Sequence, residues 1–124
     1  MEFKIDTKDT FTIITPVTDK INANLTGALR SKCEEMRQSG SNNFIIDLGE
    51  CTKIEKSAIP ELVILHEESY SADRSLVFTE LNNNIMAVLK EDEADLLINI
   101  APKMKEAVDI ISMEILERDL FSEE

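Results

Sequence analysis

The pattern of apolar and polar positions is clearest between residues 44 and 70. This stretch opens with the apolar run Phe44-Ile45-Ile46, which predicts a buried strand that ends at Asp47-Leu48. A polar segment follows over residues 49–53 and predicts a turn. Apolar positions at spacings of three and four then predict an amphipathic helix headed by Ser57, with an inward side formed by Ile59, Leu62, Val63, Leu65 and His66.

Four further strands are predicted on either side of this stretch. Residues 3–6 and 10–17 form a first pair, and the second of them is rich in β-branched residues. Pro16 marks an edge or the end of its strand, because proline has no N–H for a sheet ladder. Short apolar runs predict the last two strands over residues 75–79 and 96–100.

The helices have recognisable start and stop residues. A first helix is predicted over residues 25–39, capped by Asn22 or Asn24 and ended by Gly40 in a left-handed conformation. A later helix starts at one of the asparagines in the run 82–84, and the acidic run that follows it over residues 91–93 is expected to be solvated surface.

The closing helix carries more apolar residues than one short helix requires. Pro102 suits an early helical position, and the stripe behind it comprises Met104, Ala107, Val108, Ile111 and Ile115. Apolar residues continue over residues 110–121, so the tail prolongs this helix or forms a separate one. The tail either covers an edge of the sheet or contacts a second copy of the chain or another protein.

The predicted order of elements is ββαβαβαβα. Helices that alternate with short apolar strands are typical of the α/β class, here with a mixed sheet and four or five helices. Neither an internal repeat nor an interdomain linker interrupts the pattern. We therefore expect one domain over residues 1–124, with a C-terminal helical extension from about residue 112.

Composition and charge narrow the classes of partner. The chain has 25 acidic and 13 basic residues and a net charge of −12, which repels nucleic acids and anionic membranes. The charge favours a protein partner with a basic patch, or serves only solubility. No apolar run reaches the roughly 18 residues of a membrane helix, and the N-terminus has no signal-peptide pattern. We expect a cytoplasmic protein with Cys33 and Cys51 reduced.

Few residues suggest catalysis or metal binding. His66 is the only histidine, and its place on an apolar stripe favours a packing role over a catalytic base. Cys33 falls on an apolar helix face and Cys51 in a loop where exposure is open, and their spacing fits no zinc site. The three glycines do not cluster into a phosphate-binding loop. We expect no catalytic residue, no metal and no cofactor.

Local matches carry a resemblance to a known family. Asp47-Leu48 ends a strand, and Glu55-Lys56-Ser57-Ala58-Ile59-Pro60 follows where that family has a motif of the type Asp-Ser-Ser-Gly-Leu-Gly. The segments 78–82 and 98–111 match its later strands and helices. Over residues 11–113 the chain thus resembles the STAS domain, the fold of bacterial anti-sigma factor antagonists.

The resemblance implies a regulatory protein rather than an enzyme. Members bind a kinase-type anti-sigma factor, and a partner serine kinase often phosphorylates the second serine of the motif, with which Ser57 aligns. Phosphorylation releases the partner in this family. The resemblance implies a partner-binding surface comprising Glu55, Lys56, Ser57, Ala58, Ile59 and Glu61.

Departures from the motif keep alternatives open. Lys56 stands in place of the first serine, and Ala58 and Pro60 replace the glycines. Ser57 is either only the N-cap of its helix, which contributes about 1 kcal/mol, or a cap that is also phosphorylated. The alternative function is a STAS-like interaction or scaffold domain without phosphorylation. An enzyme using Ser57 or His66 is the third hypothesis.

Overall fold

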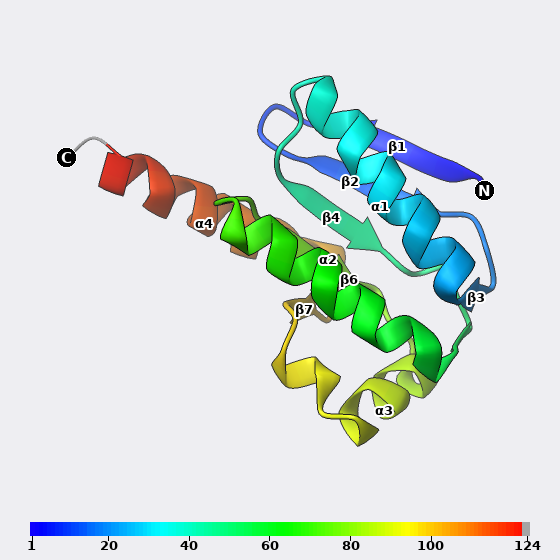
Figure 1. The fold of residues 1–124 in the computed structure, drawn as a ribbon. Coiled ribbons are helices and arrows are strands. Elements are labelled where there is room, and N and C mark those ends of the chain that lie inside the picture. Colours follow the sequence, from blue (N-terminus) through cyan, green and yellow to red (C-terminus); the bar gives the residue numbers. More distant parts are fainter. Residues whose placement is uncertain (123–124) are drawn as a thin grey trace.

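A five-stranded mixed sheet forms the centre of the computed structural model, which describes residues 1–122 (Figure 1). The strand order is β1-β2-β4-β6-β7. β1 is antiparallel to β2, and the remaining neighbours are parallel. The strands are β1 Phe3–Thr7, β2 Thr12–Pro16, β4 Phe44–Asp47, β6 Leu76–Thr79 and β7 Ile100–Ala101.

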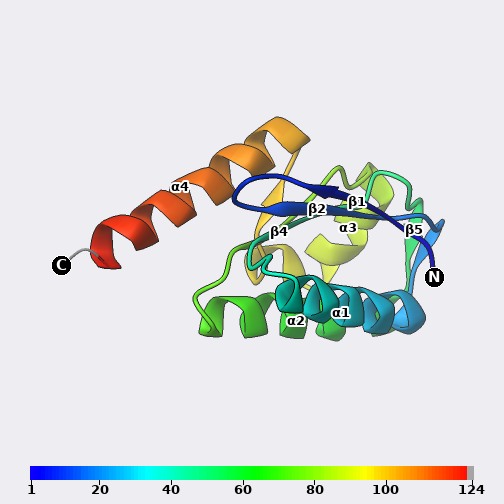
Figure 2. The ribbon, with the colours of Figure 1, turned by 90° about the horizontal axis from the view of Figure 1, so that it is seen from above.

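Helices cover both faces of this sheet (Figure 2). α1 and α2 lie side by side on one face, and α4 lies on the other. α3 joins the core on the side of α1 and α2 through its buried Ile85 and Leu89. The helices are α1 Ala23–Gln38, α2 Ile59–Ser71, α3 Asn83–Glu91 and α4 Met104–Ser122. The structure confirms the predicted α/β class with a mixed sheet and four helices.

The alternation of side chains along β4 divides the interior into two clusters. Phe44 and Ile46 belong to the larger cluster under α1, α2 and α3. Ile45 points the other way, into a smaller cluster with Ala107 and Ile111 of α4. All three β4 residues are buried. A strand covered on both faces reads as a continuous apolar run, which is the pattern of Phe44-Ile45-Ile46.

Three predicted helix start and stop residues are confirmed, whereas Pro102 lies before α4 and not in its first turn. Asn22 caps α1, since its Oδ1 accepts a hydrogen bond from Leu25 N–H at 3.0 Å. Asn82 caps α3 in the same way, with Ile85 N–H donating at 2.8 Å. Gly40 follows α1 with a φ of +104°, a value that favours glycine.

Two short strands and two 3₁₀ turns were not predicted. β3 (Lys20–Ile21) pairs in parallel with β5 (Lys53–Ile54) outside the main sheet. The turns are η1 (Lys56–Ala58) and η2 (Ala94–Leu96). Strands of two residues are shorter than any periodic sequence pattern can reveal.

The prediction of a strand over residues 96–100 is wrong in position. Leu96 and Leu97 are 77% and 56% exposed, and the strand at this edge is β7, Ile100–Ala101. Ala94 and Ile98 are buried while Leu96 between them is exposed, which fits a turn rather than a strand, where all three would share one face.

The tail prolongs the closing helix, so α4 continues without a break to Ser122 and extends past the sheet (Figure 1). Residues 123–124 lie outside the described part of the chain. The assignment of residues 1–124 to one domain stays a prediction. Over residues 1–122, no helix is both long and apolar enough to cross a membrane.

Candidate functional site

The loop that carries Ser57 leaves the sheet at the end of β4. Leu48 N–H donates to the carbonyl oxygen of Thr79 at 2.9 Å, which keeps the start of the loop beside β6. Asp47 Oδ1 accepts a hydrogen bond from Gly49 N–H at 2.9 Å and closes a tight turn. A Cβ atom at Gly49 would lie 3.0 Å from that same oxygen, so a larger residue there would have to displace the Asp47 side chain.

Backbone bonds then tie the loop to two helix starts. Thr52 N–H donates to Asp19 O at 2.7 Å, and Glu55 N–H donates to Ile21 O at 2.9 Å, just before α1. Asn82, the cap of α3, donates its Nδ2–H to Thr52 O at 3.0 Å. The loop therefore presents the residues that follow it in a defined position.

Ser57 lies in the 3₁₀ turn η1, with an exposed side chain. The prediction that Ser57 caps α2 is wrong, because Ala58 occupies the cap position and no side chain bonds there. Ala58 N–H donates to Glu55 O, and Ile59 N–H donates to Lys56 O. Pro60 has no N–H. The donors that a serine cap would use are thus taken or missing.

The two charged residues that precede Ser57 form ion pairs with other segments of the chain. Lys56 Nζ lies 3.1 Å from Glu91 Oε1 and 4.0 Å from Asp92 Oδ1 at the end of α3. The hydrogen bond to Glu91, followed by the charges of Glu91 and Asp92, raises the pKa of Lys56. Glu55 pairs with Lys20 at 3.4 Å. The acidic run after α3 is therefore not only solvated surface, since two of its residues meet Lys56.

The six residues of the expected partner-binding surface differ in exposure. Glu55, Lys56, Ser57 and Glu61 are exposed, whereas Ala58 and Ile59 are buried, at 0% and 6% exposure. The two buried residues fix the turn on the core, and the four exposed ones form its outer surface. Within residues 1–122, the Ser57 hydroxyl has no hydrogen-bonded base. Ser57 is thus an exposed serine on a short turn, next in sequence to the ion-paired side chains of Glu55 and Lys56.

Structural comparison identifies this architecture. No protein-family model and no curated protein matches the sequence. A Thermotoga maritima protein described as a putative anti-sigma factor antagonist superposes with a TM-score of 0.76 and 16% identity, over 89% of this chain and 94% of that one. RsbS of Moorella thermoacetica gives a TM-score of 0.72 and 13% identity, over 95% and 99%. The anti-sigma factor antagonist SpoIIAA in its unphosphorylated form gives a TM-score of 0.67 and 12% identity, over 90% and 96%.

The chain has the STAS fold. A Planctomyces limnophilus protein described as an anti-sigma-factor antagonist (STAS) domain protein also matches, with a TM-score of 0.69, over 89% of this chain and 97% of that one. The resemblance inferred from the sequence is therefore confirmed at the level of the fold. Ser57 lies in this STAS fold on the turn between the strand β4 and the helix α2.

His66 has the packing role predicted for it and is partly buried on α2. Its Nε2 accepts a hydrogen bond from Asn99 N–H at 3.1 Å, and its ring centroid lies 4.6 Å from that of Tyr70. Burial lowers the pKa of His66, against smaller opposite effects of Glu114 and Glu67. The one acceptor nitrogen of neutral His66 is therefore occupied by the N–H of Asn99.

Both thiols are buried in the core. Burial raises the pKa of Cys33 to about 12 and that of Cys51 to about 11. The option of an exposed Cys51 is wrong, because its side chain turns inward from the loop and joins the large cluster. Buried thiols with raised pKa values are poor nucleophiles. Among the described residues, no three His, Cys, Asp or Glu side chains are grouped to hold a metal ion.

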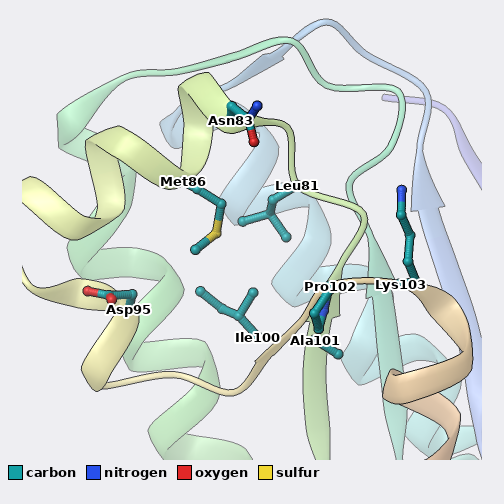
Figure 3. Close-up of a pocket in the computed structure, with 8 residues that line it drawn as sticks. All are labelled: Leu81, Asn83, Met86, Asp95, Ile100, Ala101, Pro102 and Lys103. Carbon is teal, nitrogen blue, oxygen red and sulfur yellow. The ribbon is translucent and has the colours of Figure 1, made fainter.

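A pocket of about 460 Å³ lies between α3, η2 and β7. Figure 3 shows Leu81, Met86 and Ile100 pointing toward one another in it. No sequence pattern indicates this pocket, because its walls come from separate elements. α3 connects it to the Ser57 turn, since Met86 lines the pocket and Glu91, five residues on, contacts Lys56.

Proposed function

We propose that this chain is an anti-sigma factor antagonist-like regulatory protein that binds a kinase-type anti-sigma factor. In this proposal it acts in the cytoplasm, in signal transduction that controls transcription, and is not an enzyme. The observation that carries the proposal is the exposed Ser57 hydroxyl, held on a turn that backbone bonds fix to two helix starts. The STAS fold shared with proteins described as anti-sigma factor antagonists supports it.

The proposed contact surface is the exposed part of the turn. Glu55, Lys56, Ser57 and Glu61 touch the partner, while Ala58 and Ile59 hold the turn from below. Together with their ion-pair partners, these residues carry four acidic groups and two basic groups, an excess that favours a partner with a basic surface. The same sign of charge dominates the whole chain, at −12.

Phosphorylation of Ser57 is the proposed switch. A phosphate adds a charge of about −1.5 to −2 and three acceptor oxygens. Beside Glu55, Glu61 and Glu91 it would draw Lys56 away from Glu91, because the phosphate carries the larger charge. Added charge and bulk at the centre of the contact surface would release the partner.

The test uses purified kinase-type anti-sigma factor from the same organism and measures binding by calorimetry. Wild type and Ser57→Ala are expected to bind, and Ser57→Asp is expected to bind at least about tenfold more weakly. Ser71→Asp is the matched control, since Ser71 is exposed at the other end of α2 and should leave binding unchanged. With ATP, intact-mass spectrometry should find one phosphate on wild type and none on Ser57→Ala.

A second candidate is a STAS-like interaction or scaffold domain without phosphorylation. The observation that favours it is the shortage of donors at the turn, where Ala58 and Ile59 N–H are bonded and Pro60 has none. A phosphate on Ser57 would find few backbone partners there. Binding that is equal for Ser57→Ala and Ser57→Asp, with no phosphate incorporated, would establish this candidate instead.

A further inference from the structure

The strand β1 leaves one edge of the sheet open. It stands at the end of the strand order, with β2 as its only neighbour among the described residues (Figure 1). Four of its five residues are exposed. An open edge offers a row of backbone N–H and C=O groups to another strand.

The register with β2 shows which groups face outward. Phe3 lies opposite Pro16, which has no N–H, so this pair is not hydrogen-bonded. The next pair is bonded, since Val17 N–H donates to Glu2 O at 2.9 Å. Bonded and non-bonded pairs alternate in an antiparallel ladder. The backbone groups that point away from β2 are therefore those of Phe3, Ile5 and Thr7.

The side chains that lie between Phe3, Ile5 and Thr7 in the sequence are alternately negative and positive. They share one face of the strand and are, in order, Glu2, Lys4, Asp6 and Lys8. If a second β1 lies antiparallel with Ile5 opposite Ile5, then Glu2 faces Lys8 and Lys4 faces Asp6 across the junction. All four facing pairs are then of opposite charge.

We propose that β1 pairs in this register with β1 of a second copy of the chain, which joins the two sheets into one. The outward groups of Phe3, Ile5 and Thr7 form the backbone bonds, and the side chain of Ile5, 38% exposed, packs against its counterpart. In the new ladder between the two copies, Lys4 faces Asp6 as a non-hydrogen-bonded pair, the kind of pair in which facing side chains are closest.

Charge also selects this register. A shift of two residues in either direction places Lys4 opposite Lys4 or Asp6 opposite Asp6. Like charges directly opposite one another destabilise a strand pair. Charged edges commonly prevent pairing between sheets, but here the alternation of sign leaves one arrangement attractive.

Existing contacts do not block the pairing. Lys4 Nζ meets Glu50 Oε2 at 2.6 Å, and Lys8 Nζ meets Asp6 Oδ2 at 3.1 Å. All four side chains are well exposed, and such ion pairs contribute little to stability. Replacing them with ion pairs to the second copy therefore costs little free energy. The net charge of −12 on each copy opposes association, which makes the dimer weak and salt-sensitive.

A charge-reversal set tests the proposal by sedimentation velocity over a concentration series. Wild type is expected to form dimers as concentration rises. Lys4→Glu and Asp6→Lys should each weaken association by about tenfold or more, because both symmetric pairs become repulsive. Mixing these two variants should restore a heterodimer, and the double variant Lys4→Glu/Asp6→Lys should restore the homodimer at an unchanged net charge of −12. A wild type that stays monomeric, or single variants that dimerise like wild type, would overturn the proposal.

A backbone variant separates β1 pairing from other contacts. Ile5→Pro removes an outward N–H and leaves the ladder to β2 intact, so it should be monomeric with an unchanged circular dichroism spectrum. The comparison variant Leu116→Glu changes the exposed side of α4 and should dimerise like wild type. If Ile5→Pro dimerises and Leu116→Glu is monomeric, the dimer interface lies on α4 and the pairing of β1 with β1 is rejected. Ser57→Asp should not affect self-association, so this inference stands apart from the proposed function.

Discussion

His66 illustrates how one partly buried hydrogen-bond acceptor links folding to pH. Its Nε2 must stay unprotonated to accept the hydrogen bond from Asn99 N–H. The charged groups that face the ring are the carboxylates of Glu114 and Glu67, which oppose but do not outweigh the effect of burial on its pKa. Tyr70, stacked beside it, has its own pKa raised to about 12 by burial and by its bond to Glu114.

We expect His66 to make the protein less stable as pH falls below its ordinary pKa of 6.5. The folded pKa is lower than the unfolded one, so the unfolded chain binds the proton first. The stability contributed by neutral His66 is complete above pH 6.5 and is lost as pH falls toward the folded pKa. Urea unfolding of wild type and His66→Gln across this range measures it, since glutamine keeps an acceptor without titrating.

The gap in free energy of unfolding between wild type and His66→Gln should narrow by at most about 1.4 kcal/mol per pH unit in that window. Above the window it should be constant. A gap that stays constant at lower pH would show that His66 titrates equally in the folded and unfolded states.

At the scale of elements, α4 is held by the apolar contacts of its first half, by the hydrogen bond from Tyr70 to Glu114 and by a polar anchor at Arg118 near its end. Ala107 and Ile111 are fully buried against β4 and β6. Farther along, Arg118 donates from Nη1 to Ser75 Oγ and from Nη2 to Asn43 Oδ1, both at 2.9 Å. Asn43 Oδ1 also accepts a hydrogen bond from Ser75 N–H, so this anchor joins α4 to the starts of β4 and β6.

Truncation of Ile111 should destabilise the protein far more than truncation of Leu116. Ile111→Ala removes a fully buried side chain and leaves a cavity under α4, at a cost of about 2–5 kcal/mol. Leu116 is 59% exposed on the same helix, and Leu116→Ala should change stability by less than about 0.5 kcal/mol. Thermal and urea unfolding of the pair measure the difference; equal costs would mean that α4 does not pack on the sheet as described.

Arg118→Ala should cost about 1–3 kcal/mol, because Arg118 supplies two charged hydrogen bonds between α4 and the sheet. Hydrogen exchange should then show faster exchange in the C-terminal half of α4 than in the first half. The first half keeps its apolar contacts with the sheet. Arg118→Lys, which retains one donor group, should fall between the variant and wild type. Uniform loss of protection along α4 would contradict a local anchor.

The elements that the sequence predicted correctly are those defined by local signals. Phe44-Ile45-Ile46 forms the central strand, and Asn22, Asn82 and Gly40 mark helix ends through contacts within a few residues. The prediction that Ser57 caps α2 is wrong for a reason that is also local. The N–H groups of Ala58 and Ile59 are already bonded within the 3₁₀ turn, which no sequence pattern indicates. The contact of Lys56 with Glu91 joins residues 35 apart, and no pattern in either segment indicates it.

For the whole molecule, net charge is the property that acts on every element at once. The chain carries −12, and its ion pairs between described residues are predominantly exposed. Exposed pairs contribute little individually, whereas repulsion among many like charges opposes the compact state. Repulsion over such distances is screened once the Debye length falls to about 10 Å or less.

We therefore expect added potassium chloride to raise the thermal midpoint at neutral pH. Screening weakens the repulsion in the folded state more than in the expanded unfolded chain, where the charges are farther apart. The control uses the same protein at a pH near its isoelectric point of about 4.5, where the net charge approaches zero and the salt effect should shrink. Measurements at low protein concentration keep the proposed dimer from contributing to the thermal midpoint. A midpoint that falls with salt at neutral pH would show that the exposed ion pairs outweigh the repulsion, and the argument for weak pairs at Lys4 and Asp6 would fail with it.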